Sequence, residues 1–300
     1  MPATPSAPFS SLPDLLPLPV DESLPQLRAA LSQNRSAVLV APPGAGKTTR
    51  VPLALLEEDW TRDKKIIVLE PRRIAARAAA SHMASLIGEK TGETVGYRVR
   101  MDSKVSARTR IEVVTEGVFT RMVLEDPELA GVAAILFDEF HERSLDADLG
   151  LALALDIQGA LRDDLRILPM SATIDGAKVA ELLGDAPVVE SRGRAYPVEM
   201  RHLPRAPDER PHEAVARAIR SVLAAEEGSV LAFLPGQGEI SRCASLLECA
   251  LPANADLCPL YGALVPAEQD RAIRPAPQGR RKVVIATAIA ETSITIDGVR

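Results

Sequence analysis

Two short motifs contain the residues best suited to chemistry. Residues 41–49 read Ala-Pro-Pro-Gly-Ala-Gly-Lys-Thr-Thr, and residues 138–143 read Asp-Glu-Phe-His-Glu-Arg. A loop with two glycines ahead of Lys-Thr allows backbone N–H groups to surround a phosphate. Two adjacent carboxylates can hold a divalent cation and polarise a water molecule. The two motifs together predict a site for a nucleoside triphosphate and Mg²⁺.

The first motif predicts how the triphosphate is held. Lys47 places a positive charge beside the β- and γ-phosphates, and the Thr48 hydroxyl is a ligand for Mg²⁺. The usual pattern begins with Gly, and this sequence has Ala41 there, which is compatible with the loop if its φ is negative. The predicted nucleotide-binding residues of this loop are Pro43, Gly44, Ala45, Gly46, Lys47, Thr48 and Thr49.

The second motif follows an apolar run at residues 134–137, which predicts a buried strand that ends on two acids. Asp138 is predicted to hold Mg²⁺, and Glu139 to lie beside the metal and to orient the attacking water. Adjacent acids alone are common on protein surfaces. The strand before them and the phosphate loop upstream favour a functional pair.

The elements that must position these motifs alternate along the chain, which predicts an α/β fold with parallel sheets covered on both faces. Ligand sites in such sheets gather at the carboxyl ends of strands, where both motifs are predicted to lie. Strands are predicted at residues 37–40, 65–70, 110–114, 133–137, 166–169, 187–190, 229–234 and 282–286, and helices at 24–33, 48–57, 73–87, 117–125, 146–161, 212–225 and 239–250.

The chain has 300 residues, of which 46% are hydrophobic and 25% charged, as in a soluble globular protein. We predict a loose N-terminal leader at residues 1–22, a first domain at 23–195 and a second at 196–300. The stretch rich in Arg and Pro at residues 191–210 is the predicted connection. The leader lacks the charged start of a secretion signal, so a cytoplasmic protein is expected.

Composition limits the ways in which the chain could hold a nucleic acid. The net charge is −6 and only 3% of residues are aromatic, which argues against a broadly basic surface or a platform of stacked bases. Contacts through local Arg, Thr and backbone groups to phosphates are therefore expected. The three cysteines have no metal-ligand spacing and are expected to be free thiols of a reducing compartment.

Residues 138–143 resemble the signature of the DEAH-box helicases of superfamily 2, and Phe140 in place of Ala is the form of the bacterial HrpB branch. The family resemblance implies two tandem RecA-like P-loop domains, the second truncated. It implies an ATP-dependent enzyme that moves 3′-to-5′ on RNA and belongs to the RNA helicase class. Further family motifs are matched in order at residues 71–76, 96–100, 115–117, 171–173, 231–236, 260–262 and 286–298.

The resemblance also implies roles for individual residues. The catalytic set is Lys47, Asp138, Glu139 and His141. Thr287 and Asp297 of the second domain would approach the nucleotide. The sugar-phosphate backbone would be held by Arg72, Arg73, Thr115 and Thr292, and hydrolysis would be coupled to strand movement by Ser171 and Thr173. The family's last motif, which supplies an arginine finger, is absent, so weak hydrolysis is expected of these 300 residues.

Two alternatives stay open at this point. The chain could be an NTPase that acts on DNA or on a ribonucleoprotein without separating strands, and nothing in the sequence distinguishes these substrates. It could also be a nucleotide-gated binding scaffold. A scaffold would be expected to have lost its catalytic carboxylate, whereas Glu139 is present.

Overall fold

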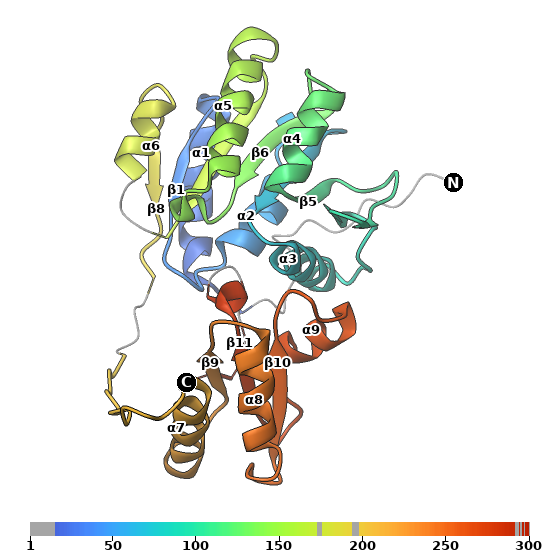
Figure 1. Ribbon diagram of the computed structural model, residues 1–300. Coiled ribbons are helices and arrows are strands. Elements are labelled where there is room, and N and C mark those ends of the chain that lie inside the picture. Colours follow the sequence, from blue (N-terminus) through green and yellow to red (C-terminus); the bar gives the residue numbers. More distant parts are fainter. Residues whose placement is uncertain are drawn as a thin grey trace. The chain divides into compact units, whose positions relative to one another are not determined.

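The computed structural model describes residues 16–172, 176–193, 198–291, 294, 296, 298 and 299 (Figure 1). The chain divides into two compact units, at residues 1–196 and 197–300. Within the described residues, no helix is long and apolar enough to cross a membrane. Each unit has its own sheet with helices packed against it, and each is described by itself below.

The first unit is built on an eight-stranded sheet in the order β4-β3-β5-β2-β6-β7-β1-β8. Neighbouring strands are parallel except for β3 and β4, which form an antiparallel hairpin at one edge. The strands are β1 (Val38–Val40), β2 (Lys65–Glu70), β3 (Val95–Val99), β4 (Asp102–Lys104), β5 (Ile111–Thr115), β6 (Val132–Phe137), β7 (Arg166–Ser171) and β8 (Val188–Glu190).

Helices cover both faces of this sheet, so side chains on a strand alternate between two cores. Ile66 and Val68 of β2 belong to the core beneath the first three helices, whereas Ile67 and Leu69 belong to the core beneath the next three. Every residue of β6 is buried, as expected of a central parallel strand. The helices are α1 (Leu24–Gln33), α2 (Lys47–Leu55), α3 (Arg73–Leu86), α4 (Glu116–Glu125), α5 (Leu145–Ala160) and α6 (Gly176–Leu182).

The second unit has a three-stranded parallel sheet in the order β10-β11-β9. Its core packs α7 and α8 against β11 through residues such as Ile219, Ile240 and Val283. The elements of this unit are α7 (Pro211–Ala225), β9 (Val230–Phe233), α8 (Gln237–Leu247), β10 (Ala255–Leu260), α9 (Pro266–Ile273) and β11 (Arg281–Ala286).

All predicted strands and helices are present with ends shifted by a few residues, but β3, β4, β10, α6 and α9 were not predicted. The β3–β4 hairpin lacks an apolar run, because Gly96 interrupts β3 and β4 is polar. A Cβ atom at Gly96 would lie 2.4 Å from the carbonyl oxygen of Lys104, so only glycine permits this close pairing. In β10, Asp256 and Pro259 interrupt the apolar pattern.

The prediction of a loose leader at residues 1–22 is wrong for its last part. Pro19–Ser23 form a short 3₁₀ helix, and the Val20 side chain is fully buried in the core of the first unit. Burial of the Val20 side chain removes apolar surface from water, which stabilises the ordered position of this segment. Residues 1–15 lie outside the described residues.

Candidate functional site

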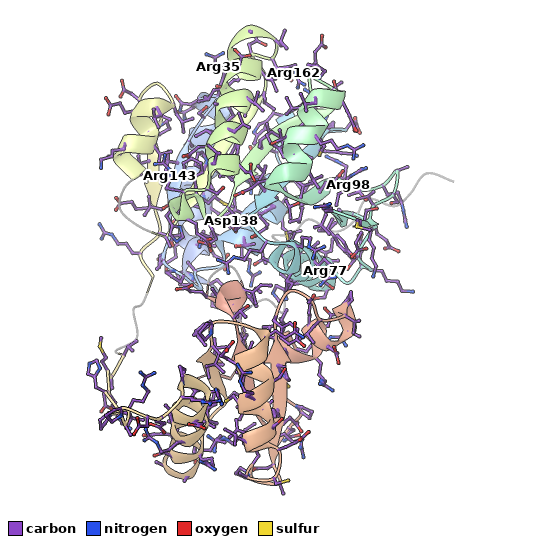
Figure 2. All side chains as sticks on the ribbon, in the orientation of Figure 1. Arg35, Arg77, Arg98, Asp138, Arg143 and Arg162 are labelled. Atoms are coloured by element: carbon purple, nitrogen blue, oxygen red, sulfur yellow. The ribbon has the colours of Figure 1, made fainter. Side chains whose placement is uncertain are left out.

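The predicted site residues of the first unit gather at the carboxyl edge of its sheet. The register pairs Leu69 with Phe137 and Val40 with Ser171. The residues that follow these strands are therefore neighbours at the same edge. Figure 2 labels Asp138, which directly follows β6 at this edge.

The phosphate loop connects β1 to α2 and has the backbone that its glycines predict. Gly44 and Gly46 adopt φ values of 75° and 90°, in the left-handed region that favours glycine. Ala41 has a negative φ and is buried, and its N–H donates to the Ser171 carbonyl at 2.9 Å. Alanine is therefore compatible with the first position of the loop. The helix α2 then begins at Lys47.

The two motifs meet through direct side-chain contacts. The Lys47 Nζ donates to the Glu139 Oε1 at 3.0 Å, and both side chains are almost fully buried. The Thr48 hydroxyl donates to the Asp138 Oδ2, and the Glu139 N–H donates to the Asp138 Oδ1 at 2.8 Å. The residues predicted to bind the phosphates are thus in contact with those predicted to bind metal and water.

Negative charge exceeds positive charge in this cluster. Burial, and then the neighbouring Asp138, raise the pKa of Glu139, although the Lys47 ammonium acts in the opposite direction. The contact with Lys47 alone would lower this pKa, but a single lysine faces Asp138 and a third carboxyl, Glu70, as well. The Thr48 hydroxyl and the Asp138 carboxylate are oxygen donors of the kind that Mg²⁺ prefers. Among the described residues, no group of three or more His, Cys, Asp or Glu side chains is arranged to hold a metal ion.

Glu70 is a site residue that the sequence analysis missed. It ends β2, is 1% exposed, and its Oε2 has no hydrogen-bond partner within the described part of the chain. Burial, and then the charges of Asp138 and Glu139, raise its pKa well above the ordinary value. The available signal was an acid that ends an otherwise apolar strand, directly before Pro71.

His141 lies between the acidic motif and the end of β7. Its Nδ1 is 3.3 Å from the Glu139 Oε2 and also 3.3 Å from the backbone N of Ala172. One nitrogen cannot serve both partners at once. It accepts from Ala172 when it carries a lone pair, and it donates to Glu139 when it carries a proton. The contact links Glu139 to residues 171–172, and Thr173 lies outside the described residues.

The residues predicted to hold a nucleic-acid backbone in this unit lie at the same edge. Arg72 immediately precedes α3, and its guanidinium donates to the Glu142 Oε2 at 3.3 Å. Arg73 is exposed in the first turn of α3. Thr115 ends β5 and pairs with Glu70 of β2. The edge therefore carries a nucleotide-type cluster and two arginines at the start of one helix.

The remaining predicted residues belong to the second unit or lie outside the described residues. Thr287 belongs to the second unit, where it follows β11 and its N–H donates to the Leu260 carbonyl at 3.2 Å. Thr292 and Asp297 lie outside the described residues. Within the described residues, Cys243 and Cys258 are buried free thiols and Cys249 is an exposed one.

Two family models match the chain. The DEAD/DEAH box helicase model matches residues 23–182, and the helicase conserved C-terminal domain model matches residues 213–300. The first match covers 160 of the 300 residues, which is more than half of the chain.

Curated relatives and solved structures agree with these models. The chain is 54% identical to ATP-dependent RNA helicase HrpB of Escherichia coli over 94% of its length, and 36% identical to the probable ATP-dependent RNA helicase DHR2 of Saccharomyces cerevisiae over 94%. It spans only 35% and 40% of those proteins. A crystal structure of E. coli DEAH/RHA helicase HrpB matches 94% of the chain with a TM-score of 0.87 at 54% identity, and the match covers 36% of that structure. These matches confirm the predicted pair of RecA-like α/β domains.

Proposed function

Because the chain belongs to the DEAD/DEAH box helicase family, we propose that it binds and hydrolyses ATP in response to RNA. The observation that carries this proposal is the contact between Lys47 and Glu139 at 3.0 Å. It brings the proposed phosphate ligand and the proposed general base into one cluster. A nucleotide-gated scaffold could use Lys47 to bind phosphate, but it would have no use for the carboxylate of Glu139 beside it.

We infer that Lys47 exchanges partners when ATP binds. Its ammonium leaves Glu139 for the β- and γ-phosphate oxygens, which carry more negative charge than one carboxylate. The released Glu139 then accepts a proton from the attacking water while the water oxygen bonds to the γ-phosphorus and the bond to the ADP oxygen breaks. The raised pKa of Glu139 makes it a stronger base than an ordinary exposed carboxylate.

The metal is proposed from the donor set alone. Thr48 and Asp138 would hold Mg²⁺, with Glu139 beside it, and the ion would offset negative charge on the phosphates. The Thr48 hydroxyl and the Asp138 carboxylate already share a hydrogen bond, so both donors face the same place. The excess of carboxyls over lysines described above fits a cation there.

RNA is the proposed nucleic acid, held by Arg72, Arg73 and Thr115 of the first unit through the sugar-phosphate backbone. A contact of this kind tolerates any sequence and weakens with salt. The chain spans about a third of the length of the E. coli relative, so strand separation and 3′-to-5′ movement are proposed for the whole protein. The RNA preference rests on relatives that carry the name of RNA helicases.

The test compares ATP hydrolysis with a single-stranded RNA, with DNA of the same sequence and with neither. We expect turnover to rise with RNA and to rise less with DNA, since the 2′-hydroxyl is the group that distinguishes them. The Lys47→Ala variant, which lacks the phosphate contact, is the negative control. Turnover that ignores both nucleic acids, or that survives in Lys47→Ala, would overturn the proposal.

A further inference from the structure

The outer side of the phosphate loop is covered by residues 16–23, which we call the strap. The Val20 side chain is fully buried, and its backbone N–H donates to the Ala45 carbonyl at 3.0 Å. The strap also contacts the edge strand β8, which pairs with β1, because the Ser23 hydroxyl donates to the Glu190 carbonyl at 3.2 Å. A segment that precedes the first helix is thus bonded directly to the middle of the loop.

The bond from Val20 determines the direction of one phosphate-binding group. The Ala45 carbonyl and the Gly46 N–H belong to the same trans peptide unit, so they point in opposite directions. Since the carbonyl points outward to Val20, the Gly46 N–H points toward the inside of the loop. Among the described residues, no backbone carbonyl accepts this N–H. It is therefore oriented for an anion that enters the loop.

The Leu18 side chain packs directly behind the same residue. A Cβ atom at Gly46 would lie 2.6 Å from the Leu18 Cδ1, closer than real side-chain contacts allow. A Cβ atom at Gly44 would meet nothing within 4 Å. The two glycines of the loop therefore differ, because Gly46 is enclosed by the strap and Gly44 is open.

Arg50 of α2 anchors the strap to the helix that follows the loop. Its side chain is about 95% buried, and its Nη2 donates to the Leu16 carbonyl at 2.7 Å. Its Nε lies 3.9 Å from the Asp21 Oδ1, and the Asp21 Oδ2 accepts the Leu18 N–H at 2.8 Å. A buried arginine on the phosphate-binding helix thus contacts both ends of the strap.

We propose that the strap is a positioning element for ATP, with Arg50 as its anchor. The strap holds the Ala45–Gly46 peptide so that the Gly46 N–H faces the β-phosphate before the nucleotide arrives. Preorganised donors bind more tightly because less conformational freedom is lost on binding. This inference rests on the proposed function. It goes beyond that function by assigning nucleotide affinity to a segment outside the loop.

The test is the affinity of the full chain for ATP and for ADP after Arg50→Met, which keeps the bulk of the side chain and removes both strap contacts. ATP and ADP share the β-phosphate, so we expect both dissociation constants to rise about tenfold, the effect of losing one hydrogen bond to a charged group. Titration calorimetry gives the constants, and thermal melting without nucleotide gives the stability.

The matched control is Arg162→Met. Arg162 lies just before β7, at the amino ends of the strands and thus opposite the phosphate loop. Arg162 is a partly buried arginine, with a side chain that is 15% exposed. It holds Asp164 and backbone carbonyls, because its Nη1 donates to the Leu129 carbonyl at 3.0 Å and its Nη2 to the Val132 carbonyl at 2.9 Å. It should lower the melting temperature and leave both nucleotide affinities unchanged. If Arg50→Met and Arg162→Met behave alike in affinity, the strap has no role in positioning and the inference is wrong.

A milder variant, Asp21→Asn, tests the positioning role of the strap if Arg50→Met does not fold. Asp21→Asn keeps the side-chain shape and removes the charge opposite Arg50, and Asp21 is 31% exposed, so folding should survive. We expect both affinities to fall about threefold, in the range of a partly exposed ion pair. Unchanged affinities of Asp21→Asn for ATP and ADP would show that the strap does not position the nucleotide. A wild-type chain that binds neither nucleotide would instead overturn the proposed function.

Discussion

The two edges of the first sheet use the same types of residue in opposite ways. At the amino edge, Asp164 accepts hydrogen bonds from Arg162 at 2.6 Å and from Lys64 at 2.6 Å. These bonds, Arg162 first, lower the pKa of Asp164. At the carboxyl edge, burial and neighbouring acids raise the pKa of Glu70 and Glu139. One edge compensates its charges internally, and the other keeps an excess of acid.

This difference indicates which edge is built for a ligand. Compensated ion pairs such as Arg162–Asp164 hold loops and helix ends in place and need no further partner. Buried acids with raised pKa values lower the stability of the fold and are retained where a bound cation or a reaction uses them. The electrostatics therefore favour the carboxyl edge as the functional one, independently of the motifs.

The largest expected effect comes from removing one acid at each edge. Glu139→Gln should keep ATP bound, because Lys47 and the loop are intact, while turnover falls by about 10²–10⁴-fold with the loss of the general base. Asp164→Asn, the matched variant at the amino edge, should leave turnover within about twofold of wild type. Steady-state ATPase assays and nucleotide titrations measure both quantities.

Equal losses of turnover in these two variants would show that the carboxyl edge has no special role. Wild-type turnover in Glu139→Gln would assign the water-activating role to another residue. His141 is a candidate, because its Nδ1 lies 3.3 Å from the Glu139 Oε2.

A smaller effect is expected from the arginines. Arg72 has a moderately exposed guanidinium beside Glu142 at the carboxyl edge. Arg72→Ala should weaken RNA binding several-fold, equally for unrelated sequences. It should also make the plot of log affinity against log salt shallower by about one phosphate contact. Arg162→Ala, at the amino edge, should leave this slope unchanged. Fluorescence anisotropy at several salt concentrations distinguishes a backbone contact from a base-selective loss.

The sequence was sufficient for the elements whose pattern is local. The buried strands of the first unit, and the loop that joins β1 to α2, follow from apolar periodicity and from glycine spacing. A shared location for the two motifs was also implied, because both follow strands of one parallel sheet. The direct contact between Lys47 and Glu139 was not predicted, since it depends on the strand order β6-β7-β1. The predicted approach of Thr287 to the nucleotide stays a prediction, because the local pattern of the sequence places this residue only within its own unit.

What the sequence could not supply are features that depend on tertiary packing. Glu70 ends a strand in the sequence, but its burial beside Asp138 depends on the order in which β2 and β6 pair. The strap likewise has the composition of a loose segment rich in Pro. Its order comes from the pocket that receives Val20 and from Arg50, thirty residues downstream of Val20.

The smallest expected effect concerns stability, and it has opposite signs at the two edges. The pKa of Glu70 is raised above its ordinary value of 4.5, so the folded state binds this proton more tightly than the unfolded state. The contribution of protonated Glu70 to the free energy of unfolding is therefore present at low pH, and it is lost as the pH rises through the raised pKa. Asp164 has a lowered pKa, so its contribution is present above its ordinary value of 3.8 and is lost on acidification.

Thermal melting of Glu70→Gln and Asp164→Asn at several pH values tests this sign difference. At about pH 8, Glu70→Gln should melt above wild type, because the neutral amide carries no buried charge and can still donate to Asp138. Asp164→Asn should melt below it, because Arg162 and Lys64 lose their carboxylate. The Glu70→Gln difference should vanish as the pH falls to the ordinary pKa of that carboxyl, whereas the Asp164→Asn difference should shrink only below the ordinary pKa of Asp164. A change of 1 kcal/mol corresponds to about 2–4 °C in a domain of this size. Melting shifts of the same sign in the two variants at about pH 8 would show that positive groups balance the acids of the carboxyl edge as well as they balance Asp164 at the amino edge. The case for a cation at the carboxyl edge would then rest on Thr48 and Asp138 alone.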